Sequence, residues 1–210
     1  MKRIFYCLAG LVLFTACHHA DPTLPIYGKR ELVTKTVNGK SEEDTVYATI
    51  PAFSFVNQYG KTITDKDLDG KIYVTDFFFT SCPSICPGMQ RNMLTVYNEF
   101  KTDPNVKILS HTIDPKHDTV AVLKQYADKL GLSGDSWWLL YGKKEDIYDI
   151  AEKHYLVSVD AQGNGGFIHQ GWFVLVDKQK RIRGSYDGTD MKQVNQLVTD
   201  MHTLEKESGE

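Results

Sequence analysis

The sequence predicts an α/β fold, in which a central mixed β-sheet is flanked by helices. Short apolar, β-branched runs alternate along the chain with longer segments whose apolar residues recur at helical spacing. The clearest run is 72–79, which is apolar throughout and typical of a strand buried on both faces of a sheet. Directly after it, an apolar stripe over 86–101 predicts an amphipathic helix. This repeated order of strand and helix is the rhythm of a sheet with helices on its faces.

The other elements continue this rhythm. A short apolar run from Ile50 to Val56 is closed by a turn, and a helix is expected to start at a cap on Asp118 or Thr119 and to end at Gly131. The remaining expected elements are strands at 106–112 and 137–141, a helix over 147–155, a hairpin of 171–177 with 181–186, and a last helix over 191–204. A closing hairpin followed by a helix is a feature of thioredoxin-like folds.

Size and charge narrow the class of protein. The chain has 210 residues, of which 41% are hydrophobic and 24% charged, and this suits one globular domain with additional sequence at its ends. Its formal net charge is only −3, and its basic residues are scattered among acids. No basic stripe is therefore available for a phosphate backbone, so we do not expect nucleic-acid binding.

The first residues predict export and a membrane anchor. Lys2 and Arg3 precede an apolar stretch over 4–16, which suits a signal peptide but is shorter than the ~20 residues that span a bilayer. The residues up to and including Cys17 resemble the lipobox of a bacterial lipoprotein, so Cys17 is expected to carry lipid and to begin the mature chain. A plain signal peptide is the alternative.

The expected organisation is therefore a lipoprotein signal peptide at 1–16, a tether at 17–49 and a globular domain at 50–210. The tether region contains prolines and a polar run but little periodicity, and it has room for a strand or two. A lipidated Cys17 places the protein in the bacterial cell envelope, anchored to a membrane and facing the periplasm.

Two of the four cysteines remain for chemistry in the mature chain. Cys7 lies in the signal peptide and Cys17 would be blocked by lipid, which leaves Cys82 and Cys86. A disulfide between them would close too short a loop to stabilise the fold much, which favours redox or metal chemistry. Both lie where the central strand turns into a helix, and the amides and dipole of a helix N-terminus favour thiolates. Pro87 suits the first helical turn.

Three ordered features resemble the SCO/SenC family of copper proteins. They are Cys82-x-x-x-Cys86 followed by proline after an aromatic strand, the Thr-Ile-Asp-Pro-x-x-Asp-Thr run at 112–119, and His169 ahead of the strand at 172–177. The resemblance implies copper, as Cu(I) or Cu(II), held by position at Cys82, Cys86 and His169. It also implies supply or preparation of the binuclear copper centre of cytochrome c oxidase. The partners would then be the copper-bearing subunit of the oxidase and another periplasmic copper chaperone.

The chemistry of these ligands agrees with copper. Two soft thiolates select Cu(I), and an imidazole adds affinity for Cu(II), so a three-ligand site can hold both states and stay open for transfer. A structural zinc site normally recruits a fourth protein ligand. The sequence departs from the family at Ile168, where an Asp commonly precedes the histidine. An acid that orients the imidazole must then come from elsewhere, and Asp114 is the candidate, beside a role in capping the turn before Pro115.

His169 follows a glycine-rich turn at 163–166, and we expect it in a loop that folds over the cysteines. Another histidine and two methionines have simpler interpretations. His117 is expected on the surface. Met89 and Met93 match the apolar stripe of their helix and are expected in the core rather than on a metal.

Two functions would use the same two sulfurs. A metallochaperone delivers copper by ligand exchange, whereas a thiol–disulfide reductase reduces the cysteines of the oxidase before copper arrives. His169 separates them, because only copper binding needs a third ligand. A thiol peroxidase is disfavoured, because Arg91 is the one arginine close to the cysteines in sequence.

Overall fold

The computed structural model describes residues 23–37, 39–162, 166–169 and 171–207, with the backbone alone at 37, 160–162 and 166–169. The signal peptide predicted at 1–16 and the lipid acceptor Cys17 lie outside the described residues, so both stay predictions, as does the three-part organisation of the chain. None of the helices in the described part combines the length and the apolar character needed to cross a membrane.

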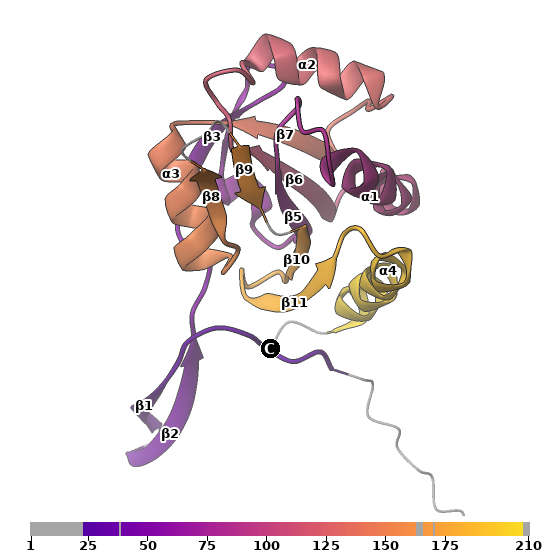
Figure 1. Ribbon diagram of the computed structural model, residues 1–210. Coiled ribbons are helices and arrows are strands. Elements are labelled where there is room, and N and C mark those ends of the chain that lie inside the picture. Colours follow the sequence, from indigo (N-terminus) through magenta and orange to yellow (C-terminus); the bar gives the residue numbers. More distant parts are fainter. Residues whose placement is uncertain (1–22, 38, 163–165, 170, 208–210) are drawn as a thin grey trace, which may run out of the picture.

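A seven-stranded mixed sheet forms the centre of the molecule (Figure 1). The order of its strands is β11-β10-β5-β6-β7-β3-β4, in which β5, β6 and β7 are parallel and the others join antiparallel. Its strands are β3 (Ser54–Asn57), β4 (Thr62–Thr64), β5 (Ile72–Phe78), β6 (Val106–Thr112), β7 (Trp137–Tyr141), β10 (Trp172–Val176) and β11 (Ile182–Asp187). The strands predicted from apolar runs are thus confirmed, and β4 adds a short edge strand.

Helices cover both faces of this sheet (Figure 1). They are the 3₁₀ turn η1 (Asp65–Leu68), α1 (Cys86–Phe100), α2 (Val120–Lys129), α3 (Lys144–Asp149), the π-helical turn η2 (Ile150–His154) and α4 (Met191–Lys206). Thr119 caps α2, since its side chain accepts a hydrogen bond from the backbone amide of Val122 at 3.4 Å. The expected helices are confirmed, except that the one predicted over 147–155 begins earlier and finishes as a π turn.

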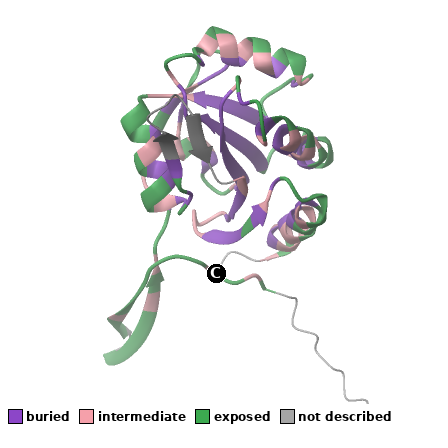
Figure 2. Ribbon diagram, in the orientation of Figure 1, coloured by how far each residue is buried: buried purple, intermediate pink, exposed green. Residues whose placement is uncertain are grey.

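The two faces of the sheet can be assigned from β5, because successive side chains of a strand point to opposite faces. Asp76 accepts a hydrogen bond from Gln90 of α1, so it faces α1. Phe77, the next residue, contacts Tyr155 just after η2, so it faces α3 and η2. Every residue of β5 is buried (Figure 2).

Two small hairpins stand outside the main sheet (Figure 1). One joins β1 (Arg30–Val37) to β2 (Lys40–Tyr47), within the region predicted as a tether. It projects from the body and buries little, with Leu32 74% exposed, so its sequence carries no strong apolar alternation. The other joins β8 (Val159–Gln162) to β9 (Gly166–His169). His169 therefore ends a strand, opposite Val159, rather than lying in the loop that we expected.

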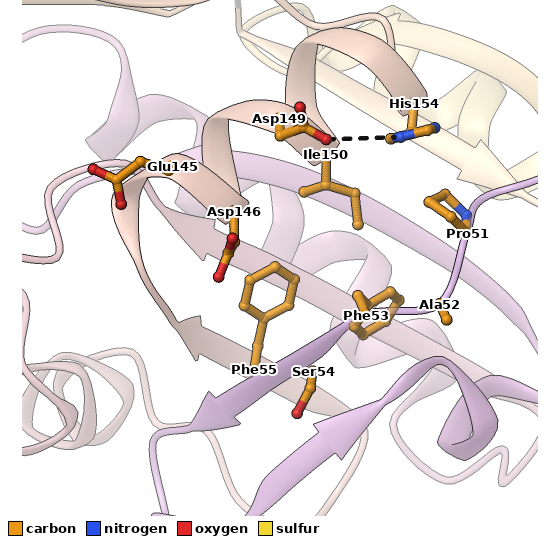
Figure 3. A pocket seen from close by; sticks show the side chains of 10 residues that line it. All are labelled: Pro51, Ala52, Phe53, Ser54, Phe55, Glu145, Asp146, Asp149, Ile150 and His154. Atoms are coloured by element: carbon orange, nitrogen blue, oxygen red, sulfur yellow. Dashed lines mark ion pairs between the residues drawn. The ribbon is translucent and has the colours of Figure 1, made fainter.

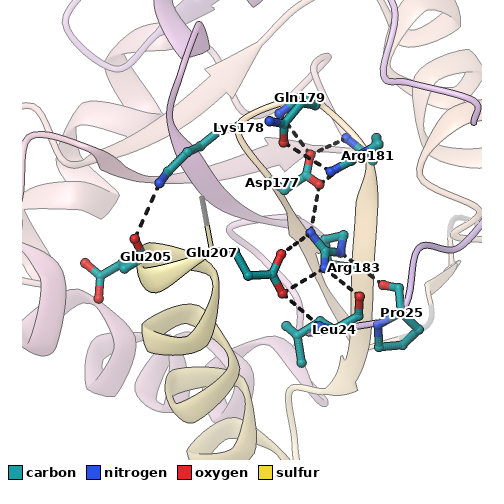
Figure 4. Close-up of polar contacts among 9 residues, drawn as sticks. All are labelled: Leu24, Pro25, Asp177, Lys178, Gln179, Arg181, Arg183, Glu205 and Glu207. Atoms are coloured by element: carbon teal, nitrogen blue, oxygen red, sulfur yellow. Dashed lines mark hydrogen bonds and ion pairs between the residues drawn. The ribbon is translucent and has the colours of Figure 1, made fainter. Parts of the chain in front are cut away.

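A buried arginine fastens the N-terminal segment to the domain (Figure 4). Arg183 of β11 is 4% exposed, and it pairs with Asp177 at 3.0 Å and with Glu207 at 2.8 Å. Its guanidinium also donates to the backbone carbonyls of Leu24 and Pro25. Charges that are buried in this way persist only when they are paired and hydrogen-bonded. The chain is thus held firmly just before the β1–β2 hairpin begins.

Candidate metal centre

Cys82 and Cys86 lie at the point where β5 gives way to α1. Cys86 is the first residue of α1, after Ile85 as N-cap, and Pro87 occupies the first turn as predicted. Cys82 precedes it in the connecting loop, where its backbone amide donates to the carbonyl of Phe79 at 3.2 Å. Both side chains are buried thiols, with Cys82 7% and Cys86 1% exposed. The fold therefore keeps both sulfurs away from bulk water.

The two sulfurs interact directly and differ in acidity. Burial raises the pKa of the Cys82 thiol, but hydrogen bonds from the Cys86 thiol and from backbone amides outweigh it, so the pKa lies below its usual value. Burial raises the pKa of Cys86 far above its usual value, and its hydrogen bond to Cys82 acts in the same direction. The prediction that both thiols are acidified by the helix is thus correct for Cys82 and wrong for Cys86. Cys82 is the sulfur prepared to be a thiolate.

The carboxylate of Asp118, in the loop after β6, holds the loop that leads to Cys82 through hydrogen bonds. Asp118 is fully buried and accepts hydrogen bonds from the backbone amide of Thr80 at 3.0 Å and from the hydroxyl of Thr112 at 2.6 Å. It also accepts from the hydroxyl of Thr80. The sequence suggested Asp118 only as a helix cap, and its role in holding the cysteine loop was missed. Its signal was its position in the loop that follows β6, since β6 is the parallel neighbour of β5 and the two loops leave the same edge of the sheet.

Asp114, the acid expected to orient the imidazole of His169, contacts His117 among the described side chains, and its predicted contact with His169 stays a prediction. Its carboxylate lies 2.6 Å from Nδ1 of His117, and its backbone amide donates to Thr112 Oγ1 at 3.1 Å. The backbone carbonyl of Asp114 accepts from the amides of His117 and Asp118. This arrangement supports the turn-capping role that we weighed beside the orienting role.

His169 ends β9, and Gly171 contacts the first turn of α1. His169 is described by its backbone alone, so the prediction that its ring binds a metal stays a prediction. Two residues further on, a methyl group on Gly171 would come within 3.3 Å of Met89 Sδ and 3.4 Å of Ile85 Cδ1. The carbonyl of Gly171 accepts from the amide of Gly188 at 2.7 Å, which fixes this approach. Gly171 therefore packs against Ile85 and Met89, which flank Cys86 at the start of α1.

A buried carboxyl group lies beneath the cysteine helix. Asp76 of β5 is completely buried and accepts hydrogen bonds from Gln90 of α1 at 2.9 Å and from the hydroxyl of Ser110. Burial raises its pKa to about 7, against the lowering effect of these hydrogen bonds. Met89 and Met93, on the same helix, are both 0% exposed, so their predicted place in the core is confirmed.

A separate hollow lies on the other face of the sheet (Figure 3). It is a cavity of about 470 Å³ between the start of β3 and the α3–η2 segment. Phe53 and Phe55 form its apolar side, and Asp146, Asp149 and His154 line the polar side. Because it opens on the α3 face, it has no part in the cysteine site, which faces α1.

Two sulfurs of this kind suit a soft metal ion. They are hydrogen-bonded to each other, and one has a lowered pKa, so a metal ion that displaces the shared hydrogen would find both donors in place. Among the described side chains, no group of three or more His, Cys, Asp or Glu residues is arranged to hold a metal. A third protein ligand would have to come from outside this set, and His169, the predicted ligand, is described by its backbone alone.

Comparison with known proteins assigns the family. The SCO1/SenC family model matches residues 41–204. The SCO1 protein homolog of Bacillus subtilis is 30% identical over 166 residues, which cover 78% of this chain and 86% of that protein.

Solved structures give the same result. A SCO1/SenC family lipoprotein from Bacillus anthracis matches with a TM-score of 0.69 at 33% identity, over 75% of this chain and 95% of the other. BsSco, a member of the Sco family of cytochrome c oxidase assembly proteins with an identified disulfide switch, gives 0.67 at 29%, over 76% and 95%. Yeast Sco1 with copper bound gives 0.59 at 25%, over 74% and 89%. The thioredoxin-like fold is confirmed, and the chain belongs to the SCO1/SenC family.

Proposed function

We propose that this chain binds copper through Cys82, Cys86 and His169, and that it delivers copper to, or prepares, the binuclear copper centre of cytochrome c oxidase. The observation that carries the proposal is the pair of hydrogen-bonded, buried sulfurs at the head of α1. The packing of Gly171 on Ile85 and Met89 supports it, because this packing brings the chain that follows His169 to the same turn.

The donor set explains why copper is the cargo. Thiolates prefer Cu(I), and an imidazole extends the affinity to Cu(II), whereas hard cations prefer oxygen ligands. The copper-bound state of yeast Sco1 supports this choice. A site of three protein ligands leaves the ion open to attack by a ligand of the partner, so copper can move by stepwise exchange.

The difference in acidity sets an order for that exchange. Cys82 offers a thiolate at little cost, whereas Cys86 must lose its hydrogen before its sulfur can bind the ion. We therefore expect copper to bind first to Cys82 and to leave Cys86 first when it is handed over. The receiving partner would be the copper-bearing subunit of the oxidase, with another periplasmic copper chaperone as the source.

The proposal includes a lipid anchor on Cys17 that holds the domain at the periplasmic side of a membrane. The clamp on Leu24 and Pro25 supports this orientation of the domain, because it holds the N-terminal segment at Arg183, near the β10–β11 turn. That turn is beside the start of β5, while the cysteines follow the end of β5. The site would thus face away from the anchor. In Cys17→Ser, we expect the protein to leave the membrane fraction and to lose incorporation of labelled palmitate; retention of both would contradict the anchor.

The third ligand provides the sharpest test of copper binding. In the full chain, His169→Ala should weaken Cu(I) binding by orders of magnitude in competition titration, because the site falls to two donors. His154→Ala is the matched control, since this ring lines the cavity on the opposite face. Unchanged affinity in His169→Ala would remove His169 from the site and with it the three-ligand chaperone.

Thiol–disulfide reduction is the second candidate, and the unequal thiols favour it. The Cys82 thiolate would attack a partner disulfide and form a mixed disulfide, while the partner's other sulfur leaves and takes up a proton. Cys86, after giving up its proton, would then attack Cys82, so that a Cys82–Cys86 disulfide forms and the partner gains two thiols. His169→Ala should leave this reaction unchanged, whereas Cys82→Ser should abolish it.

A further inference from the structure

His117 forms a preorganised pair with a buried acid. Its Nδ1 lies 2.6 Å from a carboxylate oxygen of Asp114, and the His117 side chain is 68% exposed against 9% for Asp114. A carboxylate only accepts hydrogen bonds, so Nδ1 carries the hydrogen of this pair, and in the tautomer with hydrogen on Nδ1 the lone pair is on Nε2. Histidines that bind metals almost always donate their other ring hydrogen to a carboxylate, carbonyl or water in this way.

The position of this pair relates it to the cysteines. β5 and β6 are parallel neighbours, with Phe78 opposite Thr112, so the loops that follow them leave the sheet at the same edge. Asp118 ties the two loops together through its hydrogen bond with the amide of Thr80. His117 directly precedes Asp118, and Thr80 stands two residues before Cys82. The loop that carries His117 is therefore tied to the loop that carries Cys82, at one edge of the sheet.

The turn does not depend on the imidazole. The backbone carbonyl of Asp114 already accepts from the amide of His117 at 3.0 Å and from that of Asp118 at 2.9 Å, which closes the turn. The side-chain bond between Asp114 and His117 adds orientation of the ring to a loop that is already fixed. The ring is thus an oriented and exposed nitrogen donor, on a loop bound to the loop that leads to the two buried sulfurs.

We propose that His117 is an outer copper ligand, which holds the ion through Nε2 before it reaches the cysteine pair or after it leaves. This inference rests on the proposed copper binding and adds a residue that lies outside the Cys82, Cys86 and His169 set. An imidazole can bind copper in both oxidation states. The His117 side chain is exposed to solvent, whereas both sulfurs are buried. A first contact at His117 would replace part of the hydration of the ion before the thiols are reached.

The first test measures the rate of loading. Aqueous Cu²⁺ is mixed with the full chain, and the thiolate-to-copper charge-transfer absorbance is followed by stopped flow. We expect His117→Ala to slow the association several-fold, with the same final spectrum and one copper bound at equilibrium. His202→Ala is the control, because this half-exposed ring of α4 is also paired with carboxylates, those of Glu205 at 2.7 Å and Glu99 at 3.0 Å.

The second test isolates the outer site. In the full chain carrying Cys82→Ser and Cys86→Ser, substoichiometric Cu²⁺ should broaden the imidazole NMR signals of His117 before those of His202. Asp114→Asn should weaken this binding by about tenfold, as loss of a partner that orients a metal-binding histidine does.

The outcomes separate this inference from the function on which it rests. If the wild-type chain develops no charge-transfer absorbance, the copper function fails and the outer ligand fails with it. If the wild type and His117→Ala load at the same rate, and His117 is not broadened ahead of His202, only the outer ligand is overturned.

Discussion

At the scale of single residues, the two cysteines differ more than their spacing suggests. They are close in sequence and hydrogen-bonded in space, yet Cys82 has a lowered pKa and Cys86 a raised one. The difference arises because the shared hydrogen stays on the more deeply buried sulfur. Cys82 accepts hydrogen bonds from that thiol and from backbone amides, and these bonds stabilise the charged form of Cys82.

This difference predicts the order of chemical modification. In the reduced protein near neutral pH, iodoacetamide should alkylate Cys82 well before Cys86, because the thiolate is the reactive form. Peptide mass spectrometry over a time course measures both sites. In Cys82→Ser, Cys86 should react slowly, since its pKa stays raised by burial. Equal rates at the two sulfurs would contradict the assignment of Cys82 as the thiolate.

Asp118 is the residue on which the cysteine loop most depends. Asp118→Asn replaces an acceptor oxygen with an amide group that faces the donors of Thr80 and Thr112, so the free energy of unfolding should fall by about 2 kcal/mol. Asp128→Asn is the control, because its pair with Lys124 at 2.6 Å is exposed and should change stability by less than ~1 kcal/mol. Urea denaturation compares them; equal losses would show that Asp118 has no special role.

At the scale of elements, the N-terminal segment is part of the folded domain. Tyr27 donates its backbone amide to the carbonyl of Ile182 in β11 at 2.8 Å, directly beside the Arg183 clamp. The hairpin of β1 and β2 then projects from the body (Figure 1). The region expected to be a tether is thus fastened at Leu24 and Pro25 before the hairpin begins.

Removal of the clamp should release this segment. In Arg183→Met, Asp177 keeps Arg181 as a partner, but Glu207 and the carbonyls of Leu24 and Pro25 lose their guanidinium. We expect a loss of about 3 kcal/mol in stability, because a buried ion pair is broken on one side. The amide of Tyr27 should exchange its hydrogen faster in the variant, as measured by mass spectrometry. Arg30→Met, on the exposed hairpin, should leave that exchange unchanged.

At the scale of the whole molecule, two buried titratable groups face opposite sides of the sheet. Asp76 lies beneath α1 with a pKa raised to about 7 by burial. His111 is completely buried on the other face, stacked on Phe77 at 5.1 Å, and burial lowers its pKa to about 3. Among the described atoms, neither ring nitrogen of His111 has a hydrogen-bond partner. Both groups are therefore neutral inside the fold over a range in which they would be charged outside it.

These groups predict opposite pH dependences of stability. Because the pKa of an unfolded Asp is ~4, neutral Asp76 makes its full contribution to the free energy of unfolding below that pH. This contribution, up to ~4 kcal/mol, is lost as pH rises to about 7. Because the pKa of an unfolded His is ~6.5, neutral His111 makes its full contribution to the free energy of unfolding above that pH. This contribution, up to ~5 kcal/mol, is lost as pH falls to about 3. Between these limits the two slopes oppose each other in the wild type.

Substitution should separate the slopes. Asp76→Asn should leave a protein whose free energy of unfolding rises between about pH 4 and pH 6.5, whereas His111→Phe should leave one whose free energy falls. Urea denaturation at several pH values measures both. Parallel curves for the wild type and the two variants would show that neither group is neutral in the native state.

The sequence alone determined most of the elements and the family, and it predicted the chemistry of the site. Strand β5, helix α1 and strand β6 were predictable because their apolar patterns are long and buried, and burial imposes a period on the sequence. The cysteine spacing at the entrance to α1 predicted soft-metal or redox chemistry, because that chemistry depends on residue types. The β8–β9 and β1–β2 hairpins were not resolved as such, since exposed strands need no apolar period.

The tertiary structure alone decided how these residues act on each other. The unequal acidity of Cys82 and Cys86, the hold of Asp118 on Thr80 and the pairing of Asp114 with His117 all depend on distances across separate loops. Hydrogen bonding and desolvation act over a few ångströms in space, and separation along the chain does not report these distances. The sequence could therefore name the donors, and only the folded chain could rank them.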